Sequence, residues 1–149
     1  MSKRWGEPTW YFFHIFIEKI SSAYYNSNSQ KCIKMYRNIC ENLPCPYCKD
    51  DAVKYINTHK IEKMITKDLM KTYLFNFHNH VNKKLNKTVQ MPEILDMYKK
   101  PHIANAYKFF CQEFFKPDYV SRHFSQWRRN HLKEELDKFI KEIYSNFYA

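Results

Sequence analysis

Two cysteines three residues apart, Cys45 and Cys48, are the side chains of this sequence best suited to chemistry, and they lie in the segment 43–48, LPCPYC. On a helix, residues at this spacing share one face at a separation that a disulfide can bridge. A cysteine in the first turn also lies near unpaired backbone N–H groups and the positive end of the helix dipole, which favours the thiolate. Because thiolate attack drives thiol–disulfide exchange, the segment predicts a redox-active pair.

The same two cysteines have other possible roles. They could form a purely structural disulfide or remain two buried thiols. A closed zinc site needs four ligands, but there is no second C-x-x-C, and on a helix His78 and His80 would point to different faces. The tetrapeptide CPYC is also the active-site sequence of glutaredoxins, and the segment 88–92, TVQMP, resembles a later motif of that family. Glutaredoxins, however, are βαβ proteins with glycines downstream of the motif.

A second group of polar side chains lies in the segment 77–87, FHNHVNKKLNK. On a helix, His78, Val81, Asn82 and Leu85 share one face. A flat apolar surface edged by imidazole, amide and ammonium groups suits a ligand that is part aromatic ring and part pyrophosphate. Taken alone, the segment is better explained as a surface helix with a solvated basic end.

The elements that must position these groups are predicted to be helices. Gly6 is the single glycine among 149 residues, whereas tight hairpins and glycine-rich phosphate loops depend on glycine. Dinucleotide-binding G-x-G-x-x-G folds and P-loops are therefore excluded. Apolar residues make up 44% of the chain, which is enough for a packed core, and an all-α fold is favoured.

Apolar spacing predicts helices over residues 9–23, 30–41 and 67–85, with a polar loop at 26–30. Pro44 and Pro46 end the second helix and open a third that carries the redox pair. Pro92 starts a short helix that ends near Tyr98. Lys99 to Pro101 looks like a boundary, beyond which lie an aromatic block and an amphipathic helix over 127–148.

The formal charge of +10 comes from lysines that are interleaved with Glu and Asp along the whole chain. This pattern is typical of a solvated surface, so we predict no nucleic-acid ligand. The first apolar run, residues 11–17, is too short to span a bilayer and has no cleavage site, so no membrane segment or targeting signal is predicted. A cytoplasmic location follows, where a C-x-x-C is more often catalytic or metal-binding than structural.

Three motifs occur together in a characteristic order: G-x-x-x-W-x-x-x-H at residues 6–14, P-C-x-x-C at 44–48, and H-N-x-V-N-x-x-L-x-K at 78–87. Together they resemble the core of the Erv/ALR family of FAD-linked sulfhydryl oxidases, over about residues 4 to 98. The resemblance implies a four-helix bundle with a short fifth helix that encloses FAD. It divides the chain into an oxidase core at 1–100 and a helical extension of unknown role at 101–149.

The resemblance also implies roles for individual residues. Cys45 would be attacked by the substrate thiolate, and Cys48 would lie against the flavin. Electrons would pass from a dithiol through this pair and FAD to O2, with H2O2 as the product. The expected cofactor-binding residues are Gly6, Trp10, His14, Cys48, His78, Asn79, Val81, Asn82, Lys84, Leu85, Lys87 and Tyr98. No metal is expected.

The chain departs from the family pattern in its other cysteines. The family's additional structural disulfide and shuttle cysteine pair are absent, because Cys111 is the only cysteine beyond Cys48. We expect Cys32, Cys40 and Cys111 to be small buried side chains. Electrons would then come directly from a dithiol protein or a thioredoxin-like C-x-x-C partner. The less favoured alternative is entry through Cys111 in an intermolecular disulfide.

The resemblance further implies a homodimer through the first two helices. It is nearest to the compact enzymes of large cytoplasmic DNA viruses, which suggests the host cytoplasm or the virion. A non-enzymatic alternative is a helical scaffold whose basic aromatic tail binds nucleic acid or a virion protein.

Overall fold

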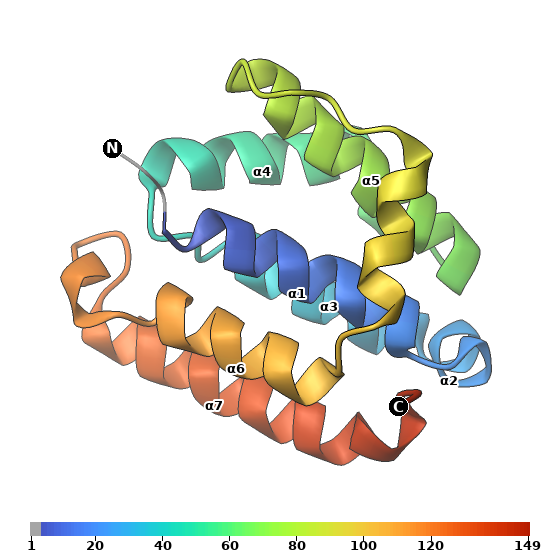
Figure 1. The fold of residues 1–149 in the computed structure, drawn as a ribbon. Helices are drawn as coiled ribbons and strands as arrows, with labels where there is room; N and C mark the ends of the chain where they lie inside the picture. The colour runs from blue at the N-terminus through green and yellow to red at the C-terminus, as the bar shows by residue number, and fades with distance from the viewer. Residues whose placement is uncertain (1–3) are drawn as a thin grey trace.

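The computed structural model describes residues 4–149 as a set of helices in three layers (Figure 1). The α-helices are α1 (Gly6–Lys19), α2 (Ser22–Ser27), α3 (Ser29–Cys40), α4 (Pro46–Thr58), α5 (Lys67–Lys84), α6 (Ile103–Phe114) and α7 (Gln126–Ile143). Short 3₁₀ helices are η1 (Ile61–Lys63), η2 (Pro92–Lys99), η3 (Pro117–Tyr119) and η4 (Tyr144–Asn146). Within residues 4–149 there is no strand beyond one isolated antiparallel bridge, Ile20 to Phe147. The predicted all-α fold is confirmed.

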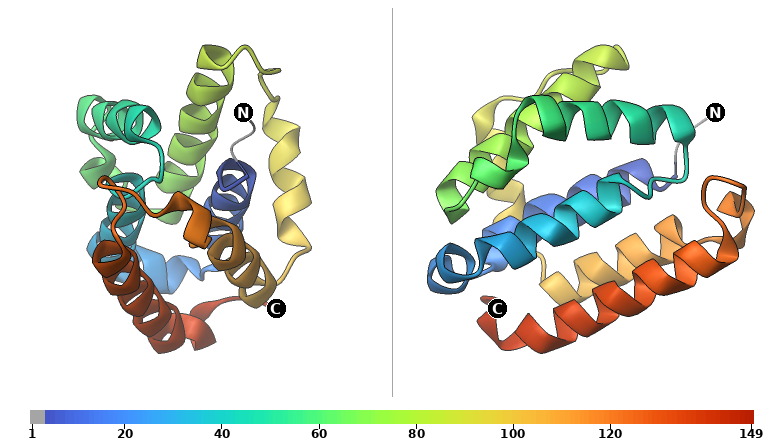
Figure 2. Two further views of the ribbon diagram at one scale, coloured as in Figure 1. Left: turned by 90° about the vertical axis from the view of Figure 1, so that its left-hand side faces the viewer. Right: turned by 180° about the vertical axis from the view of Figure 1, so that it is seen from behind.

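Helix α1 lies at the centre of the molecule. In both views of Figure 2, α1 and α3 form the middle layer, with α4 and α5 on one side and α6 and α7 on the other. Residues 12–17 are buried without interruption, so this stretch has no solvent-facing side. The Phe12 ring stacks on Phe110 of α6 at 5.0 Å, and the Phe13 ring meets Tyr36 of α3 edge-on at 4.9 Å. The aromatic content of the sequence is thus concentrated around α1.

The end of the first helix and the loop after it were predicted wrongly. Helix α1 stops at Lys19 rather than near residue 23, because Ile20 is extended with ψ of 137°. The Ser21 hydroxyl then accepts the Tyr24 N–H at 3.1 Å and caps the short helix α2. The polar stretch at 26–30 is therefore not a loop but the end of α2 and the start of α3.

The predicted helices on either side of the redox pair are confirmed. Cys45 is the N-cap of α4, and Pro46 occupies the first turn, where its missing N–H is harmless. Thr66 caps α5 by accepting the Leu69 N–H. Asn86 has a φ of 57° just beyond α5, which is the left-handed conformation that commonly ends a helix.

Residues 101–149 share a hydrophobic core with the rest of the described chain. Buried residues of α6 and α7, such as Phe114 and Leu136, belong to the same cluster as those of α1 and α3. The charged helix predicted at 127–148 is α7, which ends earlier, at Ile143. The buried ammonium group of Lys19 donates to the backbone oxygens of Lys99 and Ala149, and therefore joins η2 to the C-terminal segment.

Candidate active site

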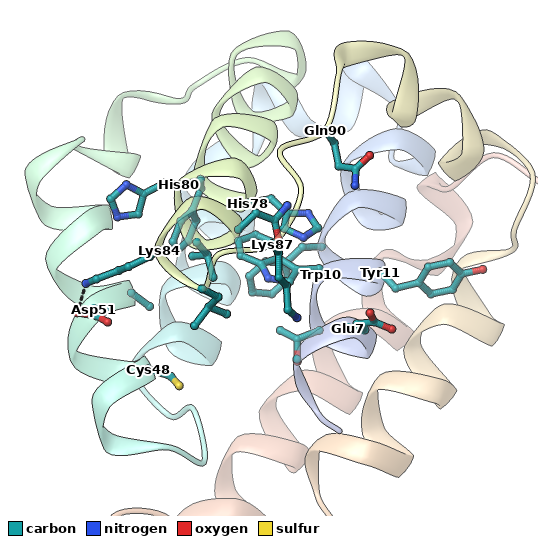
Figure 3. Close-up of a pocket in the computed structure, with 18 of the residues that line it drawn as sticks. Glu7, Trp10, Tyr11, Cys48, Asp51, His78, His80, Lys84, Lys87 and Gln90 are labelled. Carbon is teal, nitrogen blue, oxygen red and sulfur yellow. Dashed lines mark ion pairs between the residues drawn. The ribbon is translucent and has the colours of Figure 1, made fainter. Parts of the chain in front are cut away.

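A cavity of about 470 Å³ lies between α1, α4, α5 and η2 (Figure 3). It brings together residues from distant parts of the sequence. Of the predicted cofactor-binding residues, it is lined by Gly6, Trp10, Cys48, His78, Val81, Asn82, Lys84, Leu85, Lys87 and Tyr98. Residues from all three sequence motifs therefore meet in one place in the fold.

The redox pair lies at one end of this cavity. The Cys48 N–H donates to Cys45 Sγ at 3.3 Å, and the two sulfurs are 2.8 Å apart. Cys48 lines the cavity whereas Cys45 does not, and Figure 3 shows the Cys48 sulfur directed into the cavity. Tyr47, between them, is 83% exposed. Both cysteines are half-buried, and of the two only Cys48 lines the cavity.

Aromatic rings form much of the cavity wall. The Trp10 ring stacks on His78 at 4.2 Å with an interplanar angle of 6°, and it meets Phe77 edge-on at 5.1 Å. Tyr98, from η2, stacks on His14 at 4.6 Å. These flat surfaces suit a planar ligand ring.

His14 and Asn79 were predicted to bind the cofactor, but neither lines the cavity. His14 is 3% exposed, and its Nε2 lies 2.9 Å from Nδ1 of His78. The Asn79 side chain donates to the Gln90 carbonyl at 2.9 Å and accepts the Gln90 N–H at 2.8 Å. Both side chains hold the residues and backbone that form the wall.

Burial keeps both histidines of the site neutral. It lowers the pKa of His14 from 6.5 to about 3, with a smaller contribution from the neighbouring His78. Burial, followed by the charge of Lys87, lowers the pKa of His78 to about 4. At neutral pH each ring therefore carries a single proton, on one of its two nitrogens.

The predicted cations of the site have different surroundings. The Lys84 ammonium group pairs with the Asp51 carboxylate at 2.7 Å across α4 and α5 (Figure 3). Lys87 also lines the cavity, and its charge acts on His78. Lys87 is thus better placed than Lys84 to meet an anionic ligand inside the cavity.

Several residues of the cavity were missed by the sequence reasoning, among them Glu7, Tyr11, Asp51, His80 and Gln90. Asp51 follows Cys48 by three residues on α4, so helical spacing could have identified it. Gln90 lies in an irregular segment, and no pattern in the sequence places it.

The remaining cysteines are unreactive by environment. Cys32 and Cys40 are buried, and burial raises the pKa of each thiol to about 12. Burial likewise raises the pKa of Cys111 to about 11. These thiols stay protonated at neutral pH. Cys32 and Cys40 are buried as predicted, whereas Cys111 is only half-buried and that prediction was wrong. Cys40 nevertheless contributes to the cavity wall.

Residues 4–149 show neither a metal-binding cluster nor a membrane-spanning helix. The described chain contains no group of three or more His, Cys, Asp or Glu side chains arranged to hold a metal ion. None of its helices has the length and apolarity needed to cross a membrane.

Comparison with known proteins identifies the family. The sequence profile of the Erv1/Alr family matches residues 7–100. The chain belongs to the Erv1/Alr family. An FAD-linked sulfhydryl oxidase of African swine fever virus is 31% identical to this Erv1/Alr protein over 117 residues, 78% of this chain and 92% of the viral one. A protein of Invertebrate iridescent virus 3 that carries the same enzyme name provisionally is 30% identical over 110 residues, 70% of this chain and 72% of its own.

A further relative of this Erv1/Alr protein has a different name. The thiol:disulfide interchange protein DsbA of Buchnera aphidicola is 30% identical over 118 residues, 65% of this chain and 56% of its own. All three names describe thiol–disulfide chemistry. No solved structure matches the chain significantly.

Proposed function

We propose that this protein is an FAD-dependent thiol oxidase that forms disulfides in protein substrates. The observation that carries the proposal is the position of Cys48, in the wall of an aromatic, cation-edged cavity. Family membership and the names of the two viral relatives support it. The all-helical fold of residues 4–149 speaks against the glutaredoxin alternative.

The residues of the cavity fit FAD. A volume of about 470 Å³ lies in the range of cofactor sites. The rings of Trp10, Phe77 and Tyr98 suit the flat parts of the cofactor, and the ammonium group of Lys87 suits its pyrophosphate. Cys48 would face the flavin. The segment 85–91, held to α5 through Asn79, would help to enclose the cofactor.

The cysteine pair would perform the exchange in two steps. A substrate thiolate attacks Cys45 Sγ of the Cys45–Cys48 disulfide, forms a mixed disulfide and releases Cys48 as the thiolate. The second substrate thiolate attacks the mixed disulfide, so the substrate disulfide leaves and Cys45 is reduced. Tyr47 is exposed beside Cys45 and offers an aromatic contact to the incoming chain. Bound FAD supplies the two-electron transfer from the cysteine dithiol to O2, with H2O2 as the product.

The test is a visible absorption spectrum followed by oxygen uptake. The purified protein should be yellow, and addition of dithiothreitol should consume O2 and release H2O2. Cys48→Ser should abolish this uptake, whereas the matched control Cys111→Ser, outside the cavity, should retain it. A protein that binds no FAD on reconstitution, or a Cys48→Ser variant with full uptake, would overturn the proposal.

The identity of the partners follows from the same chemistry. A dithiol protein or a thioredoxin-like C-x-x-C partner would donate electrons directly to Cys45, since Cys111 is half-buried and lies outside the cavity. We propose a homodimer, as the family resemblance implies. Residues 12–17 of α1 are buried within the chain and would not contribute to its interface.

The proposal also includes the division of the chain into two parts and the location of the protein. We assign residues 1–100 to the oxidase unit, which the family match over 7–100 supports, and residues 101–149 to a supporting extension. The viral origin of the two oxidase relatives supports a place in the host cytoplasm or the virion.

A further inference from the structure

The hydrogen bond between His14 and His78 has a direction that their surroundings determine. The atoms joined are Nε2 of His14 and Nδ1 of His78, 2.9 Å apart. Both rings are neutral at pH 7, so each carries one proton, and one ring must donate to the other. Two arrangements are therefore possible: His14 donates from Nε2, or His78 donates from Nδ1.

The second ring nitrogen of His14, Nδ1, shows which of the two histidines is the donor. His14 Nδ1 is buried and has no hydrogen-bond partner among residues 4–149. If His78 donated, the single proton of His14 would have to lie on this Nδ1, which would bury an N–H without an acceptor. Orphaned buried N–H groups are rare and destabilising, and an unused acceptor is tolerated better. His14 therefore carries its proton on Nε2 and donates it to His78 Nδ1.

The hydrogen bond from His14 determines which nitrogen of His78 carries the proton. With Nδ1 occupied as an acceptor, the proton of His78 lies on Nε2, on the far side of the ring from His14. His78 lines the cavity (Figure 3). His14 is not among the lining residues. The Trp10 ring stacks on the His78 ring at 4.2 Å, and this stack and the hydrogen bond from His14 together hold the His78 ring in place.

We propose that His14 is a positioning residue, which fixes His78 as the tautomer that presents Nε2–H to an acceptor atom of the cofactor. This inference rests on the proposed FAD site, but the tautomer itself is a property of the protein alone. Trp10, His14 and His78 would then act as one unit beside the cofactor.

The first experiment is nitrogen NMR of the histidine rings in the cofactor-free protein labelled with ¹⁵N-histidine. We expect both His14 and His78 to be neutral and protonated on Nε2 at pH 7, with His78 Nδ1 shifted as a hydrogen-bond acceptor. A His78 ring protonated on Nδ1, or a charged one, would overturn the inference even if the protein binds FAD.

The second experiment compares two variants of similar shape, His14→Gln and His14→Met. The Gln amide can replace the Nε2–H donor, and the Met side chain cannot. His14→Met should lose the acceptor shift at His78 Nδ1 and bind FAD about tenfold more weakly, the size of one hydrogen bond. His14→Gln should keep the shift and most of the affinity. Equal losses in both variants would show that His14 acts only by packing, and absence of FAD binding by the wild type would instead refute the proposed function.

Discussion

Asn79 and Gln90 are joined by a pair of reciprocal hydrogen bonds, side chain to backbone, of 2.9 and 2.8 Å. This pair fastens the irregular segment 85–91 to α5 beside the cavity. Asn79→Ala removes both bonds, and we expect the free energy of unfolding to fall by about 1–2 kcal/mol and FAD binding to weaken. Urea unfolding and equilibrium dialysis with FAD measure the two effects. Asn79→Asp keeps the acceptor for the Gln90 N–H, so it should fall between wild type and Ala.

The buried histidines make stability depend on pH. The pKa values of about 3 for His14 and about 4 for His78 lie below the ordinary 6.5, so the unfolded chain binds more protons at mildly acidic pH. Their contribution to stability is complete above pH 6.5 and is lost as the pH falls toward the folded-state pKa values. At pH 5 the loss is about 2 kcal/mol per histidine. Urea unfolding of the cofactor-free protein at pH 7 and pH 5 measures it.

The matched control for this pH effect is His14→Met, in which one of the two titrating rings is missing. The fall in unfolding free energy between pH 7 and pH 5 should then be smaller than in the wild type by about 2 kcal/mol. An identical fall in both proteins would mean that carboxylates, and not this histidine pair, account for the acid sensitivity.

Lys87 and Lys84 should contribute unequally to cofactor binding. Lys84 is paired with Asp51 at 2.7 Å, whereas Lys87 has no ion pair of this kind within residues 4–149. Lys87→Met should weaken FAD binding by about tenfold or more, the size of a charge-assisted hydrogen bond. Lys84→Met should have a smaller effect. Titration of flavin fluorescence at low and high salt checks this order, and the reverse order would contradict it.

The contact between α6 and α1 should dominate the stability of the C-terminal half. Phe110 has no exposed surface, stacks on Phe12 and contacts Phe114 at a tilted angle. Phe110→Ala should lower the unfolding free energy by about 3–5 kcal/mol, as expected for a large cavity in a core. Its neighbour Phe109 is 44% exposed, so Phe109→Ala is a control that should change stability much less. Chemical denaturation of both variants tests the difference.

The helices that could be predicted from the sequence are those with a clear start signal and one apolar face. Pro46 and Pro92 each mark the start of an element correctly. The break at Ile20 was missed because no proline or glycine marks it in the sequence. The cap formed by Ser21 then starts α2. For α6 the sequence showed an aromatic block without indicating which partner it packs on, since the contact with α1 joins residues far apart in the chain.

The cavity was predictable to the extent that its residues follow helical spacing. Trp10, Cys48 and His78 lie on helices, and their positions agree with the motifs. The indirect roles of His14 and Asn79 depend on hydrogen bonds between elements, which spacing along one helix does not specify. The motifs thus predicted residues that lie in or next to one cavity. They did not distinguish the residues that line the cavity from those that only contact its wall.

Lys19 connects the C-terminal segment to η2, which forms part of the cavity wall. Its ammonium group holds the last residue of η2, and its own backbone carbonyl accepts the Tyr148 N–H at 2.8 Å. A ligand that steadies η2 should therefore slow hydrogen exchange at Tyr148, at the opposite end of the extension. Because coupling between two sites is reciprocal, loosening the tail must weaken that ligand by the same factor. We therefore expect that an affinity tag fused after Ala149, if it disturbs these contacts, changes the affinity of the cavity for its ligand.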